Sequence, residues 1–290
     1  MYFSVTRKTD YRIAMHKIDA RQIFTIAQKE FWDRIRSRWV LAVAVIFTAF
    51  ALVIAYFGAA QQGAVGFKGI ELTIASLTSL VIYLVPLIAL ILGYDAMVGE
   101  RERGSLDLLL SLPITRLELL LGKYLGLAAA LTLSTVAGFG LVGVVLSYGI
   151  GMTGLLDYGG FILSTLLMGL AFLSLALLIS VLATSKVTAS GAAIALWFFY
   201  VLVYDLILLG LLVVTEGQYM SGLFPVLLMM NPADIFRILN IFSLEEVKSL
   251  YGLATVFPPA LANPWLLGSI MLFWILTPLG LAYAKFRQSN

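Results

Sequence analysis

Very few side chains in this sequence could take part in covalent or metal chemistry. The 290 residues include no Cys, and the one His, His16, lies in a basic stretch near the N-terminus. Thiols and imidazoles are common nucleophiles, general bases and soft-metal ligands, and a chain without Cys forms no disulfide. We therefore expect no catalytic residue, no metal ligand and no cofactor bound by this chain, and we predict that it is not an enzyme.

Gly99 and Gly104 have the G-x-x-x-x-G spacing of a phosphate-binding loop, but their surroundings do not fit one. Such a loop continues with Lys and then Ser or Thr, whereas Ser105 follows the second glycine here. The pair Gly122-Lys123 is followed by Tyr124 and fails the same test. If ATP drives this protein, another chain must bind the nucleotide.

The segment around these glycines is instead charged and amphipathic. A Glu-Arg-Glu-Arg run at 100–103 is followed by leucines at 106 and 108–110. Pro113 interrupts the segment, and Thr115 with Glu118 forms a T-x-x-E capping box that starts a fresh helix. A solvated charge run is the alternative, although such a run does not require an apolar face. We predict a helix–break–helix element with one helix before Pro113, which docks on another protein.

Two acidic residues lie in or beside apolar runs. Asp205 is in the middle of one run, where an ionised carboxylate costs about 2.5–3.5 kcal/mol to insert. It is either a functional proton or cation site or a hydrogen-bonded residue that joins two helices, and both hypotheses stay open. Asp95 ends another run, and we expect it to be structural and to pair with Lys123 or a nearby arginine.

The apolar runs are long enough to cross a bilayer. The chain is 61% hydrophobic and 12% charged, with a mean hydropathy of +0.99, outside the range of soluble domains. Backbone groups in lipid must bond within their own segment, so each run is predicted to be a helix. We predict an all-α membrane protein whose six transmembrane helices form one domain over 40–284. The runs are 40–58, 74–94, 124–147, 161–183, 189–214 and 264–284.

The distribution of Lys and Arg predicts the orientation. Nine of the 19 basic residues precede Val40, and seven more lie in the second and fourth connections and at the C-terminus. The other connections hold only Lys68, Arg237 and Lys248. The positive-inside rule therefore places both termini, including the tail 285–290, in the cytoplasm of a bacterial or archaeal cell. The net charge of +3 reflects this topology and gives no reason to expect nucleic-acid binding.

A basic amphipathic helix is predicted over residues 20–39. Apolar residues such as Ile23, Ile26 and Ile35 recur there at helical spacing among arginines, as in helices that lie on membrane headgroups. The helix is either a simple juxtamembrane anchor or also a contact for a partner protein. Residues 1–19 are a tail to which we assign no role.

The last external connection, 215–263, is predicted to form a helical cap. Residues 231–234 read as a helix start, with Asn at the N-cap, Pro at the first helical position and an acid in the first turn. A second capping box lies at 243–246, and residues 222–230 are too short to cross the membrane, so we predict a re-entrant hairpin there. The cap residues that we single out are Asn231, Pro232, Asp234 and Arg237.

The second connection resembles the cytoplasmic signature of ABC-2-type permeases. The resemblance is carried by 99–106, 111–113 and 121–123, and residues 27–39 are similar to the family's lead-in helix. It implies a type V exporter-like fold, pairing of two copies, and a coupling segment, residues 95–122, that sits in a groove of a separate cytoplasmic ATPase, where ATP and Mg bind. The coupling residues that the resemblance implies are Gly99, Glu100, Arg101, Glu102, Arg103, Gly104, Ser105, Leu106, Leu109 and Pro113.

Dispersed blocks resemble the branch of this family that serves nitrous oxide reductase maturation. These blocks are 56–60, 93–96, 198–206 and 228–239, and the whole resemblance covers nearly everything from 23 to 287. It implies a periplasmic β-helical accessory protein and a role in copper-site assembly. Cys is absent, the single His is near the N-terminus, and the nine scattered Met are more typical of packing than of a copper relay, so we favour mechanical work. Whether a copper or sulfur species crosses stays open.

Two other transport functions compete with this hypothesis. One is an ABC-2 exporter of a lipid, peptide or drug. The other is an ion-coupled secondary transporter that uses Asp205, which we rank lower because the sequence shows neither repeats nor broken helices with facing ends.

Overall fold

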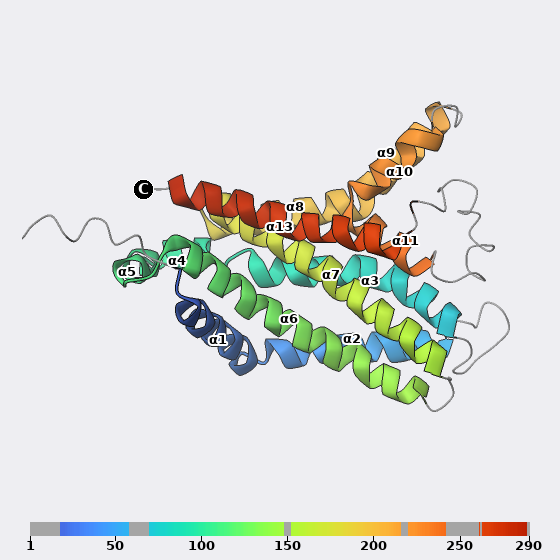
Figure 1. Cartoon of the computed structure of the whole chain (residues 1–290), viewed down its shortest axis with the longest axis horizontal. Coiled ribbons are helices and arrows are strands. Elements are labelled where there is room, and N and C mark those ends of the chain that lie inside the picture. The colour runs from blue at the N-terminus through green and yellow to red at the C-terminus, as the bar shows by residue number, and fades with distance from the viewer. Residues whose placement is uncertain are drawn as a thin grey trace, which may run out of the picture.

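The computed structural model describes residues 18–57, 70–147, 152–215, 220–241, 261 and 263–288. Every regular element in these ranges is a helix, so the predicted all-α class is confirmed (Figure 1). Six helices in the described ranges are long and apolar enough to cross a membrane, as predicted. They are Trp39–Phe57, Thr73–Glu102, Arg116–Val145, Gly154–Leu182, Lys186–Val214 and Pro264–Gln288.

The helices α2, α3, α6, α7 and α13 run side by side along the long axis of the molecule (Figure 1). One end, here named the coupling end, holds α1, α4, α5 and the C-terminus. The helices are α1 (Ala20–Arg36), α2 (Trp39–Phe57), α3 (Ile70–Gly93), α4 (Val98–Glu102), α5 (Ser105–Ser111), α6 (Arg116–Ser147), α7 (Met152–Leu182), α8 (Lys186–Phe198), the π-helix η2 (Phe199–Val203), α9 (Tyr204–Val214), α10 (Met220–Met229), α11 (Pro232–Ile241) and α13 (Pro264–Gln288).

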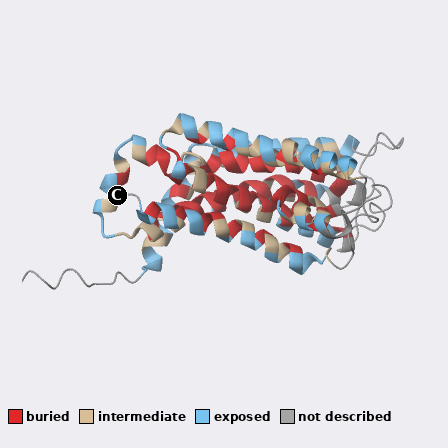
Figure 2. Ribbon diagram, turned by 90° about the horizontal axis from the view of Figure 1, so that it is seen from above, coloured by how far each residue is buried: buried red, intermediate tan, exposed pale blue. Residues whose placement is uncertain are grey.

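Helix α7 forms the centre of the bundle. It packs against α3, α6, α11 and α13. The buried residues lie in the interior of the bundle, and the exposed ones on its outside (Figure 2). Phe139 of α6 and Phe161 of α7 are fully buried, and their rings meet edge to face at 5.5 Å. Interlocking side chains of this kind hold helices together in lipid, where apolar burial alone gives little preference for protein contacts.

Helix α1 lies directly against the first turns of α6 because two glycines of α6 face it. A Cβ atom on Gly122 would stand 2.6 Å from the Cβ of Ile26, and one on Gly126 would stand 2.5 Å from the carbonyl oxygen of Ala27. No real side chain fits at such distances. The glycines therefore let the backbones of α1 and α6 approach closely, which brings polar side chains of both helices together.

The coupling segment contains two short helices before Pro113, so the prediction of one helix is wrong. Gly104 has φ 70°, in the left-handed region that glycine adopts without strain, and it separates α4 from α5. Leu112 is extended, as the residue before a proline usually is, and it ends α5. The result is a compact turn in which α5 points away from the bundle (Figure 1).

The predicted capping box at the start of α6 is confirmed. The amide of Thr115 donates to Glu118 Oε2 at 2.6 Å, and the amide of Glu118 donates to Thr115 Oγ1 at 3.2 Å. Helix α6 therefore begins at Arg116, well before the apolar run expected at 124, and continues to Ser147.

The fifth span is interrupted by the π-helix η2 between α8 and α9. Beyond it, α9 and α10 rise away from the bundle together (Figure 1). The expected re-entrant hairpin at 222–230 is wrong, because residues 222–229 belong to the single helix α10, which packs beside α9. The predicted capping box at 243–246 and most of the tail 1–19 lie outside the described residues.

Candidate functional site

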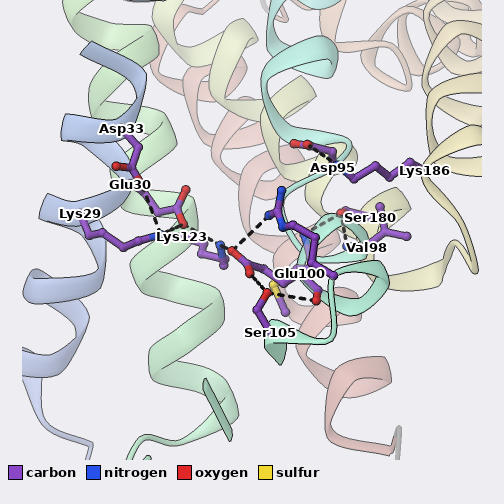
Figure 3. Close-up of polar contacts among 12 residues, drawn as sticks. Lys29, Glu30, Asp33, Asp95, Val98, Glu100, Ser105, Lys123, Ser180 and Lys186 are labelled. Atoms are coloured by element: carbon purple, nitrogen blue, oxygen red, sulfur yellow. Dashed lines mark hydrogen bonds and ion pairs between the residues drawn. The ribbon is translucent and has the colours of Figure 1, made fainter. Parts of the chain in front are cut away.

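A buried ion cluster joins three parts of the chain at the coupling end. Lys123 Nζ of α6 lies 2.6 Å from Glu30 Oε1 of α1 and 3.1 Å from Glu100 Oε1 of α4 (Figure 3). The side chains of Lys123, Glu30 and Glu100 are 3%, 7% and 11% exposed. Charges this far from water remain ionised only while they compensate one another. The cluster therefore ties α1, α6 and α4 into one unit.

Further polar groups surround this cluster. The Ser105 hydroxyl donates to the Glu100 carboxylate, and Arg103 lies 3.5 Å from Glu100 (Figure 3). On the other side, Lys29 lies 3.6 Å from Glu30 and 3.2 Å from Asp33. Burial lowers the pKa of Lys29, but the carboxylates of Glu30 and Asp33 raise it more, so this pKa lies above its ordinary value. Lys29 thus stays charged and adds positive charge at the rim.

Helix α4 is held against α7 and α8 by hydrogen bonds from its first and last residues. Ser180 Oγ of α7 accepts from the amides of Met97 and Val98 at 2.8 and 3.0 Å. Arg101 Nη1 donates to the carbonyl of Ala183 at 2.9 Å, and Glu102 accepts from the amide of Lys186 at 2.7 Å. These bonds occupy amides that a helix start leaves unpaired. A short helix that would be unstable alone is therefore fixed by its neighbours.

Asp95 lies between two cations at the start of this turn. Its carboxylate is 3.8 Å from Arg34 and 3.6 Å from Lys186 (Figure 3 labels Asp95 and Lys186). The expected pairing with an arginine is confirmed, but the alternative pairing with Lys123 is wrong, because Glu30 and Glu100 hold that lysine.

The junction between α5 and α6 contacts the residue before α1 and the last turn of α13. Glu118 Oε1 accepts from the amide of Asp19, just before α1, at 2.6 Å. Arg116 Nη1 donates to the carbonyls of Phe286 and Arg287 at 2.8 Å each, which occupies orphan carbonyls at the end of α13. A movement of this junction must therefore also move α1 and α13.

The exposed surface of α5 combines two large leucines with two polar residues. Leu108 and Leu112 are 70% and 53% exposed, and Asp107 and Ser111 beside them are also exposed. We name Asp107, Leu108, Ser111 and Leu112 the α5 tip. Leu108 on α5 and Leu112 directly after its last residue are large, apolar and exposed, as side chains at protein–protein contacts often are.

The coupling residues implied by the sequence divide between the inside and the outside of this structure. Gly99, Glu100 and Leu106 are buried, Arg101, Ser105 and Leu109 are partly buried, and Glu102, Arg103, Gly104 and Pro113 are exposed. Leu108 was predicted as part of the apolar face and Leu112 as part of the family signature, but neither was among the implied coupling residues, although both are more exposed than Leu106 and Leu109.

A second charged group lies toward the opposite end of the bundle. Arg237 of α11 donates to Asp205 of α9 at 2.9 Å and to Asp234, one turn earlier, at 2.5 Å. Asn231, the helix cap of α11, donates to Asp234 and to the carbonyl of Tyr200 in η2, each at 2.9 Å. The intramembrane acid and the cap residues, which were predicted separately, therefore form one group that we name the Asp205–Arg237–Asp234 triad.

In the triad, the carboxylates of Asp205 and Asp234 both accept hydrogen bonds from the guanidinium of Arg237. Burial and the nearby charge of Asp205 raise the pKa of Asp234 and the charge of Arg237 lowers it, with a net value of about 7. Because Arg237 occupies both oxygens of Asp205, that carboxylate has little capacity left for a cation. The geometry favours the helix-joining hypothesis for Asp205 over the ion-site hypothesis.

Comparison with known proteins gives the family. The sequence model described as ABC-2 family transporter protein matches residues 24–290. The chain belongs to the ABC-2 transporter family. It is 42% identical over 274 residues to the probable ABC transporter permease protein NosY of Stutzerimonas stutzeri, covering 92% of this chain and 98% of that protein. It is 43% identical over 272 residues to the NosY of Pseudomonas aeruginosa, with the same coverage of each chain.

The chain is therefore a permease subunit of an ABC transporter. In such a transporter the nucleotide site lies outside the permease. The permease thus has two candidate functional sites. One is the coupling end, with its buried ion cluster and the α5 tip, and the other is the Asp205–Arg237–Asp234 triad near the start of α9.

Proposed function

We propose that a separate cytoplasmic ATPase docks on the α5 tip and drives this permease to do conformational work at its opposite face. The single observation that carries this proposal is the pair of exposed leucines, Leu108 on α5 and Leu112 directly after it. Helix α5 packs on α4, and Glu100 of α4 is bonded to the buried Lys123. Burial of these leucines against the ATPase would supply affinity, and the contacts of α4 with the bundle would transmit a movement of α5 to the spans. ATP and Mg would bind to the partner, and this chain would hold no cofactor of its own.

The polar contacts behind the α5 tip provide a route for movement. The cluster around Lys123 joins the coupling segment to α1 and α6, Ser180 joins it to α7, and Arg116 joins its far end to α13. A rotation of α5 on nucleotide binding would therefore shift several spans as one body. This is coupling through contiguous packed elements, as ABC permeases require.

The coupling end lies in the cytoplasm under this proposal, in the inner membrane of a bacterium or archaeon. The basic residues of the described chain support it, because Arg21, Arg36 and Arg103 lie at that end and are exposed. Both termini would then be cytoplasmic, and the α9–α10 hairpin would face the periplasm.

A second copy of the permease would cover part of the α8–η2–α9 face. Only 11% of an 18-residue apolar stretch of the span Lys186–Val214 is buried within one chain. Large apolar side chains such as Ile194, Leu206 and Val213 are 59%, 66% and 67% exposed along it. Membrane lipids would cover the remaining apolar surface of the homodimer.

The maturation of nitrous oxide reductase is the process that we propose for this work. Both similar proteins are permeases named NosY, and the likeness covers nearly their whole length. The permease has no Cys, only His16 and nine Met that are scattered along the chain, so its sequence gives little support for a chain of copper ligands through the spans. A mechanical role in copper-site assembly, together with a periplasmic β-helical accessory protein, fits this chemistry.

The docking proposal is tested by replacing the apolar tip. In the double variant Leu108→Asp/Leu112→Asp, two carboxylates would be desolvated at the interface, so we expect co-purification with the ATPase to fall at least tenfold. Ile18→Asp is the matched control, because Ile18 is also apolar and 58% exposed near this end. An ATPase that remains bound to the double variant at the wild-type level would refute docking on the α5 tip.

A further inference from the structure

Helix α1 has one face committed to the bundle and one face that no described residue covers. The inner face packs on Gly122 and Gly126 and buries Glu30 against Lys123. The outer face carries aromatic and basic side chains three or four residues apart, and Phe24 and Trp32 on it are 69% and 48% exposed. The outer face consists of Arg21, Phe24, Thr25, Gln28, Lys29, Trp32 and Arg36.

The positive charge of this outer face is not neutralised within the described part of the permease. Glu30 points inward to Lys123, and Asp33 is used by Lys29 at 3.2 Å. Arg34 is also turned inward, toward Asp95. In the described ranges, Arg21, Arg36 and Arg38 have no carboxylate within ion-pair distance. The surface thus offers free guanidinium groups beside exposed aromatic rings.

The position of α1 restricts what this surface can meet. Helix α1 ends at Arg36, and the first membrane span begins at Trp39. Arg38 makes the turn between them with φ 57°, so α1 cannot move far from the membrane boundary. At that boundary, aromatic rings lie at the level of the headgroups, and arginine binds phosphate with strong, charge-assisted hydrogen bonds.

We propose that the outer face of α1 binds the headgroups of anionic phospholipids in the leaflet at the coupling end. Arg21, Arg36 and Arg38 pair with the phosphates, and Phe24 and Trp32 lie at the boundary of the acyl chains. Since Glu30 on the inner face is bonded to Lys123, and Lys123 to Glu100, the bound lipid also steadies the coupling segment. The proposal does not depend on docking of the ATPase.

The absence of Cys from the chain allows a direct test with one nitroxide label. The label is attached to Gln28→Cys, between Phe24 and Trp32, and the whole permease is placed in nanodiscs of phosphatidylcholine, with or without phosphatidylglycerol. We expect phosphatidylglycerol to convert a mobile spectrum into an immobilised one. Each arginine near an anionic surface should change the ratio of immobile to mobile label roughly fivefold.

Two double variants, each of which removes two positive charges at the coupling end, test whether the label responds to the outer face of α1 or only to the net charge. In Arg21→Gln/Arg36→Gln the ratio in phosphatidylglycerol should fall roughly 25-fold. In Lys285→Gln/Arg287→Gln, which removes two exposed charges at the same end, it should keep the wild-type value. Equal spectra in the two lipids would overturn the proposal. So would immobilisation that appears only when the ATPase is added, because the outer face would then bind protein. Thermal melting of each variant confirms that it is folded.

Discussion

Lys123 illustrates how a charged side chain is kept inside this bundle. Its ammonium group is almost completely buried, and two carboxylates from other helices lie within 3.1 Å of it. The Coulomb attraction and the hydrogen bonds offset the large free energy of desolvation only as long as all three partners are present. A buried cluster of this kind fixes the mutual positions of α1, α4 and α6 more than it adds to stability.

Removing the cation should therefore be severe. Lys123→Met leaves Glu30 and Glu100 buried without a partner, and we expect the free energy of unfolding to fall by about 3–5 kcal/mol. Thermal unfolding of the purified permease in detergent measures the loss. The triple variant Lys123→Met/Glu30→Gln/Glu100→Gln should regain most of it, because no charge remains to be buried. A single variant as stable as the wild type would contradict the buried cluster.

Contacts between residues close in the sequence were predictable, whereas contacts between distant residues were not. The cap of α11 by Asn231 and the capping box of Thr115 were predictable, because each depends on residues no more than three positions apart. The bond between Glu30 and Lys123 joins residues 93 positions apart, and no local pattern indicates it. The same holds for Asp205, whose partner Arg237 lies on another helix.

Asp234 should make stability depend on pH. Helix α11 lies outside the six candidate spans, and the pKa of Asp234 is raised from 3.8 to about 7. Between these values the folded chain holds a proton that the unfolded chain has released. The contribution of Asp234 to the free energy of unfolding therefore falls as pH rises from about 4 to 7 and then becomes constant.

The melting temperature at pH 5.5 and at pH 8 tests this effect. The wild type should lose more stability between the two than Asp234→Asn, which keeps a hydrogen-bonding side chain but does not titrate. Asp157→Asn serves as the control, because Asp157 is exposed on α7. If Asp234→Asn showed the same pH dependence as the wild type, the raised pKa would be incorrect.

At the scale of the elements, close contact between α1 and α6 determines where the lead-in helix lies. The spans were predictable from hydropathy, because each reflects the composition of a continuous segment. The break at Gly104 could also have been predicted, because a left-handed glycine directly after the C-cap is a common helix stop. The π-helix η2 could not, since no local pattern indicates it. The α9–α10 hairpin could not be predicted for the same reason.

The α1–α6 contact can be tested on one helix with two glycines. A methyl group at Gly126 would overlap Ala27 and Glu30, so Gly126→Ala should lower the free energy of unfolding by about 1–3 kcal/mol. Gly140→Ala, also on α6, meets no atom within 4 Å and should stabilise the helix by about 0.5–1 kcal/mol. Opposite signs for the two variants in thermal unfolding are expected. Equal effects would mean that α1 does not pack at Gly126.

At the scale of the whole molecule, the two charged groups lie toward opposite ends of the bundle. One end has the α5 tip and the Lys123 cluster, and the other has the α9–α10 hairpin anchored by the Asp205–Arg237–Asp234 triad (Figure 1). The central helices α6, α7 and α13 connect these ends. This arrangement fits the proposal that a movement at the coupling end is transmitted through the bundle to the α9–α10 hairpin.

The proposed role in maturation predicts a defined defect in cells. Cells without this permease should produce nitrous oxide reductase that lacks copper at its active site, measured as metal content of the purified enzyme. Wild-type permease should restore the copper, and Leu108→Asp/Leu112→Asp should not, because the ATPase no longer docks. A reductase with full copper content in cells without the permease would exclude this process and leave export of another substrate.

Binding of the ATPase at the α5 tip can be tested by cross-linking from single cysteines. The chain has no Cys, so Leu108→Cys and Leu156→Cys each carry one photoactivatable cross-linker, at positions 70% and 69% exposed but on α5 and on α7. We predict that Leu108→Cys forms a covalent product with the ATPase and that Leu156→Cys does not. A product at Leu156, or none at Leu108 in a complex that still hydrolyses ATP, would contradict the account.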